Sequence, residues 1–408
     1  MAPRVDRTAV EKMSLSLSGR ESLKVVARGL LRAVDVALPR RSERSFFKST
    51  GSTFLVLDCE AALGFSFVNT ALYQAIKTSN KCSKLVVGCA PLALDGLSAN
   101  PFIDCLLDLG QLDSAFFPAL FRLLSWRLSH SRPDVALVNC SKETFSIDGL
   151  ILASGAGYRV GSGLTSVYDR MPAVSPELSS LENAMARLNP LGIDNVVGEP
   201  RIYFNSKDLA KAKALMQQCS QWRIAYVTQT SGGHPNAWWD DRFAVVADAI
   251  AGMTGAPAIF LGTKGDQTAI ETIQAQMKSQ SISLAGHTSV RELAAFVSQC
   301  DLVVSLDTGT LHVATGAGTP TVVIAPAHQP AHEWLPIRRK NAKVLRRDDI
   351  FCRECRLFYC PTRDCMDLIG SDEVIAAVKE IIGAGGPDIA GRDSRIASSL
   401  SHEGPEII

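Results

Sequence analysis

Residues 300–326 read CDLVVSLDTGTLHVATGAGTPTVVIAP, and the fold can be worked out from this stretch. An apolar run at 302–306 ends in a polar turn, a helix-compatible segment follows, and a second apolar run occupies 321–325. The pattern predicts a strand, a turn, a short helix and another strand, which together form one unit of a parallel sheet. Ligands of such sheets bind beyond the carboxyl ends of the strands. The turn at Asp307 is therefore the first candidate site.

This turn carries groups suited to a phosphate-bearing ligand. Thr308 and Thr310 supply hydroxyls where the helix begins, and Gly309 lets a ligand approach the backbone closely. Unpaired amides at the start of a helix can receive a phosphate. His312, on the first helical turn, would face the same spot. An alternative interpretation is that Thr310 only caps the helix and that His312 is an ordinary, partly buried histidine.

Length and composition describe a globular protein with room for two domains. The chain has 408 residues, of which 46% are hydrophobic and 20% charged. Its formal net charge of +1 gives no reason to expect nucleic acid as a partner. No apolar run approaches the roughly 20 residues of a membrane-spanning helix, and the N-terminus lacks a signal-peptide pattern, so the expected location is the cytoplasm. Of eleven cysteines, seven are scattered singly, as is usual for reduced thiols.

Short apolar runs alternate with helical patterns along most of the chain. The expected strands are 54–57, 85–89, 105–109, 134–139, a short one within 155–161, 224–227, 258–261, 302–306 and 321–325. Such alternation predicts an α/β fold with parallel sheets covered on both faces. The expected division is an extension at 1–50, an N-terminal domain at 51–200, a C-terminal domain at 201–383 and a flexible, Gly- and Ser-rich tail at 384–408. A cleft between the two domains is the usual place for a substrate.

The extension at 1–50 is basic and amphipathic. Leu23, Val26, Leu30 and Val34 recur at helical spacing, and basic residues line another face and continue to Lys48. Residues 20–48 could therefore lie on an anionic membrane surface. Packing of the same helix on its own domain, with a solvated charged face, is equally compatible with the pattern.

Four cysteines gather near the C-terminus. Cys352, Cys355, Cys360 and Cys365 fall within fourteen residues. Four thiolates at this density can hold zinc or iron in a tetrahedral site, and such a site would be structural because no coordination position stays open. Two local disulfides, or four reduced thiols under a loop, remain as alternatives.

The C-terminal part of the sequence resembles a known family. The run GHTSVRELAAFVSQCDLVVSLDTGTLHVATGAGTPTVVIAP at 286–326, then Glu333-Trp334-Leu335-Pro336, then CRECRLFYCPTRDCMDLI at 352–369, is similar to glycosyltransferase family 9, that of the ADP-heptose:lipopolysaccharide heptosyltransferases. The resemblance implies a GT-B type fold with two Rossmann-like domains, the nucleotide sugar on the C-terminal one and the acceptor on the N-terminal one. Asp307, Thr308, Gly309 and His312 would hold the donor's diphosphate and sugar, and Asp266 its nucleoside.

The loop at 230–236 is long enough to wrap a ligand, and Thr230 and Asn236 are its candidate donor contacts. Asn236 stands where the family usually offers a lysine to the leaving phosphates. A second departure is Gly64-Phe65, where the family typically has Gly-Asp and the aspartate accepts the proton of the acceptor hydroxyl. Phenylalanine cannot take a proton. Glu60 is the favoured substitute base and Asp58 the second, although both could be solvated loop charges.

The resemblance implies an inverting glycosyltransferase that moves a heptose or related sugar from an ADP-linked donor to a saccharide or lipid-linked acceptor. No catalytic metal is expected, because helix-start amides and Thr308 would stabilise the leaving diphosphate. The alternative is a nucleotide-sugar-binding or scaffolding protein on the same fold with impaired catalysis, for which Phe65 and Asn236 are the evidence. An epimerase on a similar fold carries less weight. The expected location extends to a peripheral position on the inner face of the inner membrane.

Overall fold

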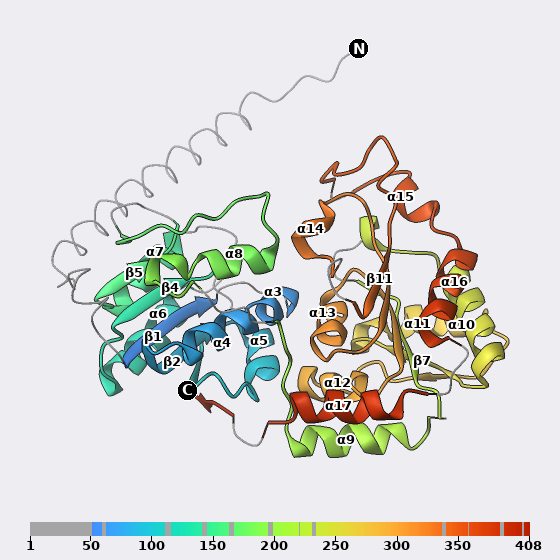
Figure 1. Cartoon of the computed structure of the whole chain (residues 1–408), viewed down its shortest axis with the longest axis horizontal. Coiled ribbons are helices and arrows are strands. Elements are labelled where there is room, and N and C mark those ends of the chain that lie inside the picture. The colour runs from blue at the N-terminus through green and yellow to red at the C-terminus, as the bar shows by residue number, and fades with distance from the viewer. Residues whose placement is uncertain are drawn as a thin grey trace, which may run out of the picture.

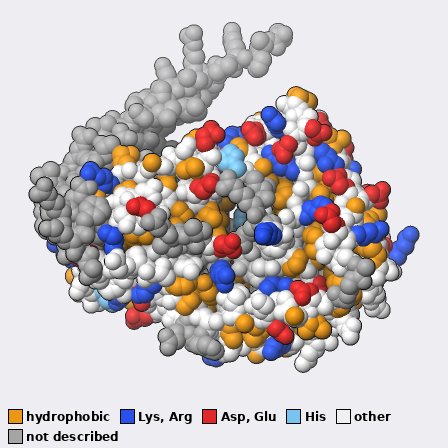
Figure 2. Space-filling view, in the orientation of Figure 1, with side chains coloured by type: hydrophobic (Ala, Val, Ile, Leu, Met, Phe, Trp, Pro, Cys, Tyr) orange, Lys and Arg blue, Asp and Glu red, His pale blue; other side chains and the backbone are white. Residues whose placement is uncertain are grey.

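A computed structural model describes residues 51–58, 63–110, 116–140, 145–162, 167–194, 199–219, 221–230, 234–336, 340–357, 359–383, 387–401 and 404–408. These residues form two lobes, each built on a six-stranded parallel sheet (Figure 1). The two lobes contact each other, and charged side chains of both signs are interspersed over the face drawn in Figure 2. The basic extension at 1–50 lies outside the described residues.

The first sheet belongs to the N-terminal lobe. Its strands, in spatial order, are β12 (Glu406–Ile407), β3 (Cys105–Asp108), β2 (Cys82–Cys89), β1 (Ser52–Asp58), β4 (Val135–Val138) and β5 (Tyr158–Val160). Its helices are α3 (Leu63–Val68), α4 (Thr70–Thr78), α5 (Pro91–Leu97), α6 (Phe116–Ser129), α7 (Phe145–Ser154) and α8 (Ser180–Ala186), with a 3-10 turn, η1 (Asn189–Leu191). Successive residues of β1 enter opposite cores, one shared with α4 and α8 and the other with α6 and α7.

The second sheet has the spatial order β11 (Ala342–Leu345), β10 (Thr321–Ile324), β9 (Leu302–Leu306), β6 (Ile224–Val227), β7 (Ala258–Leu261) and β8 (Ser281–Ser283). Around it lie α9 (Ser206–Met216), α10 (Asp240–Thr254), α11 (Gln267–Gln274), α12 (Val290–Val297), α13 (Gly309–Gly316), α14 (Ala331–Trp334), α15 (Asp364–Asp367), α16 (Ser371–Ile382) and α17 (Ile389–Ser399), with 3-10 turns η2 (His234–Asn236) and η3 (Lys264–Asp266). The strand order reverses between β6 and β9, where parallel sheets open a crevice for ligands.

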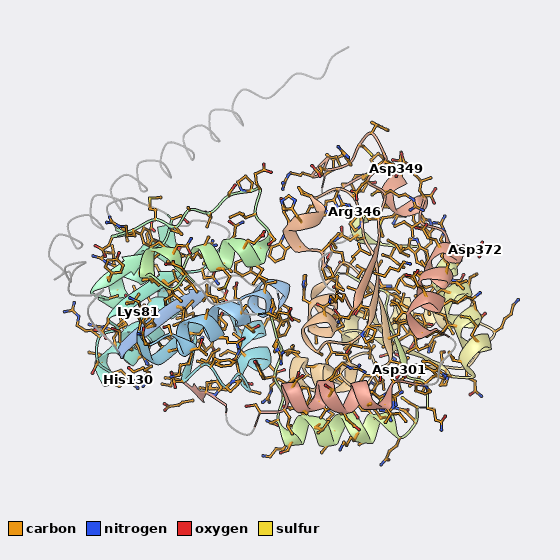
Figure 3. The ribbon with its side chains drawn as sticks, in the orientation of Figure 1. Lys81, His130, Asp301, Arg346, Asp349 and Asp372 are labelled. Carbon is orange, nitrogen blue, oxygen red and sulfur yellow. The ribbon has the colours of Figure 1, made fainter. Side chains whose placement is uncertain are left out.

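The sequence predicted a flexible tail at 384–408, but its described residues, 387–401 and 404–408, include helix α17 and strand β12. Helix α17 lies beside α9 under the C-terminal lobe, and the chain then crosses to the N-terminal lobe, where β12 pairs in parallel with β3 (Figure 1). Arg392 and Asp301, both nearly inaccessible, form a two-pronged ion pair, and Arg392 also donates to the carbonyl of Gln221. Asp301 is labelled in Figure 3, close to α17. Ile396 and Leu400 also pack against the core of the C-terminal lobe, so polar and apolar contacts together hold this segment.

Removal of Arg392 should destabilise the protein strongly. In Arg392→Ala the Asp301 carboxylate stays buried without its partner, and breaking a buried ion pair in this way costs about 3–5 kcal/mol of unfolding free energy. Ser398→Ala, an exposed change on the same helix, should stay within about 0.5 kcal/mol. Urea unfolding followed by circular dichroism measures both. Equal midpoints for the two variants would show that α17 contributes little.

The two lobes are held together by polar contacts and by helix packing. Asp95 on α5 accepts hydrogen bonds from the Val290 amide at 2.7 Å and from Arg291 Nε at 3.2 Å, at the start of α12. Ser180 on α8 donates to the carbonyl of Glu333 on α14 at 2.6 Å. These contacts place α3 and α8 of one lobe against α13 and α14 of the other, which is where the candidate site lies.

Candidate functional site

The turn at Asp307 lies at the point where the strand order of the second sheet reverses. Asp307 follows β9, and Thr230 follows the neighbouring strand β6. Thr230 Oγ1 donates to the backbone carbonyl of Asp307 at 3.5 Å, so the loops after both strands meet. Two residues predicted from sequence to contact the donor are thus brought together at the crevice.

Helix α13 begins directly after this turn with its amides uncapped by a side chain. Thr308 is the N-cap residue, its backbone is extended, and its side chain makes no capping hydrogen bond. The amide of Leu311 is bonded to the Thr308 carbonyl at 3.0 Å. Amides at such a start carry partial positive charge and favour an anion. Thr310 is not the N-cap residue of this helix, as the alternative interpretation had it, because Thr308 holds that position.

The Asp307 carboxyl has an unusual protonation equilibrium. Burial raises its pKa to about 6, against the opposing effect of the Arg346 guanidinium. Arg346, labelled in Figure 3, is itself fixed by hydrogen bonds to the carbonyls of Pro326 and Gln329, at 3.0 and 2.7 Å. A carboxyl that titrates near neutrality beside an uncapped helix start marks a functional position better than either feature alone. Nothing in the sequence pointed to Arg346.

Helices α3 and α13 approach each other closely at two glycines, Gly64 and Gly309. A Cβ atom on Gly64 would lie 2.4 Å from Cδ2 of His312, and a Cβ on Gly309 would lie 3.2 Å from Cβ of Leu63. His312, a predicted donor residue of the C-terminal lobe, therefore packs directly on the start of α3 in the N-terminal lobe. The contact fixes the imidazole at the boundary of the two lobes.

We expect Gly64→Ala to displace His312. The added methyl group cannot be accommodated at 2.4 Å, so the ring or α3 must shift, at a cost of about 1–3 kcal/mol in stability. Misplacement of a site group by a fraction of an ångström should lower kcat/KM about tenfold. Gly252→Ala on α10 is the matched control, because a Cβ there meets nothing within 4 Å. Parallel thermal melts and rate assays compare the two variants, and similar rates would mean that the position of His312 does not matter.

Beside this contact, an aromatic cluster borders a cavity between the lobes. The rings of Phe65 and Trp334 are 5.8 Å apart, and those of His312 and Trp334 are 6.1 Å apart. The cavity has a volume of about 170 Å³. Its lining comes from both lobes and includes Phe67, Leu181, Glu182, His312, His332 and Trp334. Phe65 is thus part of an apolar contact between lobes, where a carboxylate would be poorly solvated.

The two candidate bases differ in what the structure says of them. Glu60 lies outside the described residues. Asp58, at the end of β1, is fully buried and accepts hydrogen bonds from the Tyr73 hydroxyl and, at 3.2 Å, from Asn69 Nδ2. Burial and the neighbouring Asp58 raise the pKa of Tyr73, which therefore keeps its proton and donates it to this bond. These contacts give Asp58 a structural role at the end of β1.

The remaining predicted donor contacts have contrasting surroundings. Asp266 Oδ2 accepts from the amide of Thr263 at 2.6 Å and from its hydroxyl at 2.9 Å, so this carboxylate caps its own turn. Asn236, in η2, has a buried Oδ1 with no hydrogen-bond partner among the described residues. A buried amide oxygen without a partner is costly. This oxygen can accept a hydrogen bond from a ligand hydroxyl or N–H group, but not from a phosphate, whose oxygens are themselves acceptors.

The four clustered cysteines occupy the segment between β11 and α16. All four are free thiols, and within the described ranges no three potential ligands are close enough to hold a metal ion. Cys360 Sγ accepts a hydrogen bond from the amide of Arg363 at 3.3 Å, and this bond lowers the pKa of the thiol. The described non-glycine residues with positive φ are all in this segment: Glu354, Arg356 and Arg363.

Comparison with known proteins finds similar sequences and similar folds. The sequence model of glycosyltransferase family 9 (heptosyltransferase) matches residues 166–361. The lipopolysaccharide core heptosyltransferase OpsX of Haemophilus influenzae is 34% identical over 95 residues, which are 23% of this chain and 27% of that protein. Lipopolysaccharide heptosyltransferase 3 of Escherichia coli is 23% identical over 212 residues, which are 50% of this chain and 60% of that protein. The matches thus span less than two thirds of these relatives' own lengths.

Solved structures match over more of the chain. A glycosyltransferase family 9 protein from Veillonella parvula has a TM-score of 0.74 at 17% identity, covering 82% of this chain and 98% of that one. The ADP-heptose lps heptosyltransferase II of E. coli has a TM-score of 0.63 at 15% identity, covering 81% and 98%. The iron-containing dodecameric glycosyltransferase TibC of enterotoxigenic E. coli has a TM-score of 0.51 at 14% identity, covering 82% and 76%. The predicted α/β fold of GT-B type, with two Rossmann-like units, is confirmed, as is the resemblance on which it was based.

Proposed function

We propose that this protein transfers a heptose or related sugar from an ADP-linked donor to a saccharide or lipid-linked acceptor. It is a relative of the heptosyltransferase-type glycosyltransferases of family 9. In this proposal the transfer proceeds with inversion at the anomeric carbon. The observation that carries the proposal is the uncapped start of α13 beside the Asp307 carboxyl, at the reversal point of the second sheet. The family match and the similarity to an ADP-heptose enzyme support the choice of donor.

In this proposal the C-terminal lobe holds the donor. The first amides of α13 and the Thr308 hydroxyl bind the diphosphate and stabilise the charge that develops as it leaves. Asp307 and His312 bind hydroxyl groups of the sugar. The side-chain Nδ2 of Asn236 donates to a phosphate oxygen in place of the family's lysine. Asp266 binds the nucleoside, for which it must exchange a bond within its own turn. No step requires a metal ion.

The acceptor enters from the N-terminal lobe and its hydroxyl attacks the anomeric carbon. Glu60 takes the proton of that hydroxyl, because Phe65 cannot and because Asp58 is buried against Tyr73. The cavity between α8 and α14, next to His312, is the proposed place for the acceptor sugar, with Trp334 as an apolar surface for its ring.

The experiment that tests the proposal is a panel of ADP-, UDP- and GDP-linked sugars incubated with pure protein, with and without saccharide acceptors, while nucleotide diphosphate release is followed. Acceptor-dependent release of ADP supports transfer. The second candidate function, nucleotide-sugar binding without turnover, is favoured by Phe65 in the aromatic cluster. Tight ADP binding without release in the presence of the acceptors that the family uses would select it.

We further propose a structural zinc or iron ion on Cys352, Cys355, Cys360 and Cys365. The donor chemistry fits, since thiolates bind both metals and one thiol already accepts an amide hydrogen bond of the kind that stabilises a thiolate. Three non-glycine residues in this short segment have positive φ, an unfavourable backbone conformation. Bonds to a metal ion would stabilise it. The thiols would have to draw together around the ion. The iron-containing relative TibC supports this choice.

Elemental analysis checks the metal proposal. Purified protein should contain about one equivalent of zinc plus iron, and removal by a chelator should lower the melting temperature. Cys355→Ser should lose the metal, whereas Cys219→Ser, a half-buried cysteine outside the cluster, should retain it. A metal content below about a tenth of an equivalent would rule the site out.

No helix among the described residues combines the length and the apolar character needed to cross a bilayer. A cytoplasmic position, peripheral on the inner face of the inner membrane, is proposed because a lipid-linked acceptor would be found there. Residues 20–48 are proposed as one membrane contact from their sequence alone, and no nucleic acid is part of the proposed reaction.

A further inference from the structure

Helix α6 carries large apolar side chains on both of its faces. Ala119, Leu123 and Trp126 are buried against the first sheet and α7. On the other side Phe117 is 78% exposed, and Phe121, Leu124 and Leu128 are 72%, 42% and 90% exposed. A helix on the surface of a globular protein normally turns a polar face outward. The outward face of α6 therefore needs an explanation.

The exposed residues form one stripe. Phe117, Phe121, Leu124 and Leu128 are separated by four, three and four positions, which places them in one row along the helix. Single exposed apolar residues are common on protein surfaces, but a row that includes Phe121, Leu124 and Leu128 is typical of a contact surface. The stripe lies on the side of the first sheet opposite α4 and α8, and no residue of α6 lines the cavity between the lobes.

Positive charges flank the stripe. Residues 116–132 contain Arg122, Arg127 and Arg132 and no acidic residue. Arg122 pairs with Asp108 at 2.8 Å. Arg127 and Arg132 instead pack on the same residue, since a Cβ atom on Gly155 would lie 3.2 Å from Cζ of Arg127 and 3.2 Å from Nε of Arg132.

These two arginines lack an acidic partner among the residues that the structure describes. Arg132 Nε donates to the carbonyl of Gly155 at 3.2 Å, and Nε and Nη1 of Arg127 are buried without a hydrogen-bond partner. Two guanidinium groups held side by side in this way repel each other and favour an anion between them. The apolar stripe and the cationic pair occupy the same helix and its C-terminal extension, and they are independent observations.

We propose that α6 docks on an anionic lipid surface, with the apolar stripe in the interface and the exposed Arg132, beside the half-buried Arg127, on a lipid phosphate. Charge favours a lipid surface over two other possible partners of this face, the chain's own N-terminal segment and a second copy of the protein. The chain's own segment at 20–48 has eight basic and three acidic residues, so it would bring like charge to the arginines. A second copy docked through the same face would do so too. An anionic bilayer offers both an apolar phase and negative charge.

Vesicle sedimentation with the full chain tests the proposal. The protein should bind vesicles of phosphatidylcholine and phosphatidylglycerol in equal amounts, and binding to phosphatidylcholine alone should be at least about tenfold weaker. Phe121→Asp/Leu128→Asp should weaken binding to the mixed vesicles by at least about tenfold. The matched control is Val245→Asp/Met253→Asp on α10, whose side chains are 52% and 41% exposed, and it should bind as wild type. Arg132→Gln should weaken the preference for the anionic lipid, because Arg132 is the exposed arginine of the pair.

Equal vesicle binding by the α6 and α10 variants would overturn the proposal, and so would equal binding of the wild type to both kinds of vesicle. A change from oligomer to monomer in the α6 variant would also overturn it, because the stripe would then be a protein interface. Thermal melts show whether the variants fold. The four substituted apolar residues are all exposed, so both double variants should unfold at the wild-type temperature. If Phe121→Asp/Leu128→Asp does not fold, Phe121→Ser/Leu128→Ser replaces it. The readout is binding, so it does not depend on the proposed transferase activity.

Discussion

Replacing Asp307 with asparagine should lower kcat/KM on the order of 100-fold at pH 8 and, at the same pH, make the protein more stable. The loss of rate follows because the ionised carboxylate is proposed to accept hydrogen bonds from the donor sugar, and an amide cannot reproduce charge-assisted bonds. The gain in stability follows because burial disfavours that same ionised form. One substitution thus separates function from stability.

The pH dependence of both effects has a definite sign. Burial raises the Asp307 pKa from 3.8 to about 6 in the folded protein. The folded protein holds the Asp307 proton more tightly than the unfolded chain does. The stability that this difference contributes is fully present below about pH 4 and is lost as the pH rises through 6. The melting temperatures of wild type and Asp307→Asn should therefore converge at low pH and separate above pH 6. Wild-type kcat/KM should rise over the same interval, and a difference in melting temperature that is constant from pH 4 to 8 would contradict the assignment.

Replacing Glu60 with glutamine should have the largest effect on turnover. Glutamine has the shape of glutamate but cannot accept the acceptor's proton, and loss of a general base costs on the order of 100- to 10,000-fold in rate. ADP binding should be unchanged, because Glu60 is proposed to act on the acceptor. Acceptor-dependent ADP release and calorimetric titration with ADP measure the two properties separately.

Glu177→Gln is the matched control for Glu60→Gln, because Glu177 is an exposed glutamate of the same lobe. Its release rate should equal that of the wild type. If both variants are fully active, the proton goes to another group in the cleft. If the wild type binds ADP but releases none with any acceptor, the protein is a nucleotide-sugar-binding protein and Phe65 marks the loss of catalysis.

Most of the strands could be predicted because both sheets are buried on both faces. Buried parallel strands appear as short apolar runs, and 302–306 and 321–325 became β9 and β10. Strands β8, β11 and β12 were not predicted, since they are short, lie toward sheet edges and contain polar residues. Helix α17 was missed for a related reason. Arg392 and Asp301 are separated by 91 positions, and composition does not reveal such a pair.

The candidate site could be predicted only in part. The turn at 307–310 is local, so its helix start and its polar side chains follow from the sequence. The burial of Asp58 depends on Tyr73 and Asn69 from a later helix, and the sequence made it look like a loop carboxylate. The contact of His312 with Gly64 joins two lobes and required the three-dimensional structure. What the sequence could not supply is the set of contacts between distant segments.

A crystal structure with ADP bound tests the central claim most directly. Diphosphate oxygens should lie within roughly 2.7–3.2 Å of the first amides of α13, with Thr308 and Asn236 turned toward them. ADP bound elsewhere on the second lobe, with the start of α13 closed by neighbouring side chains, would contradict it.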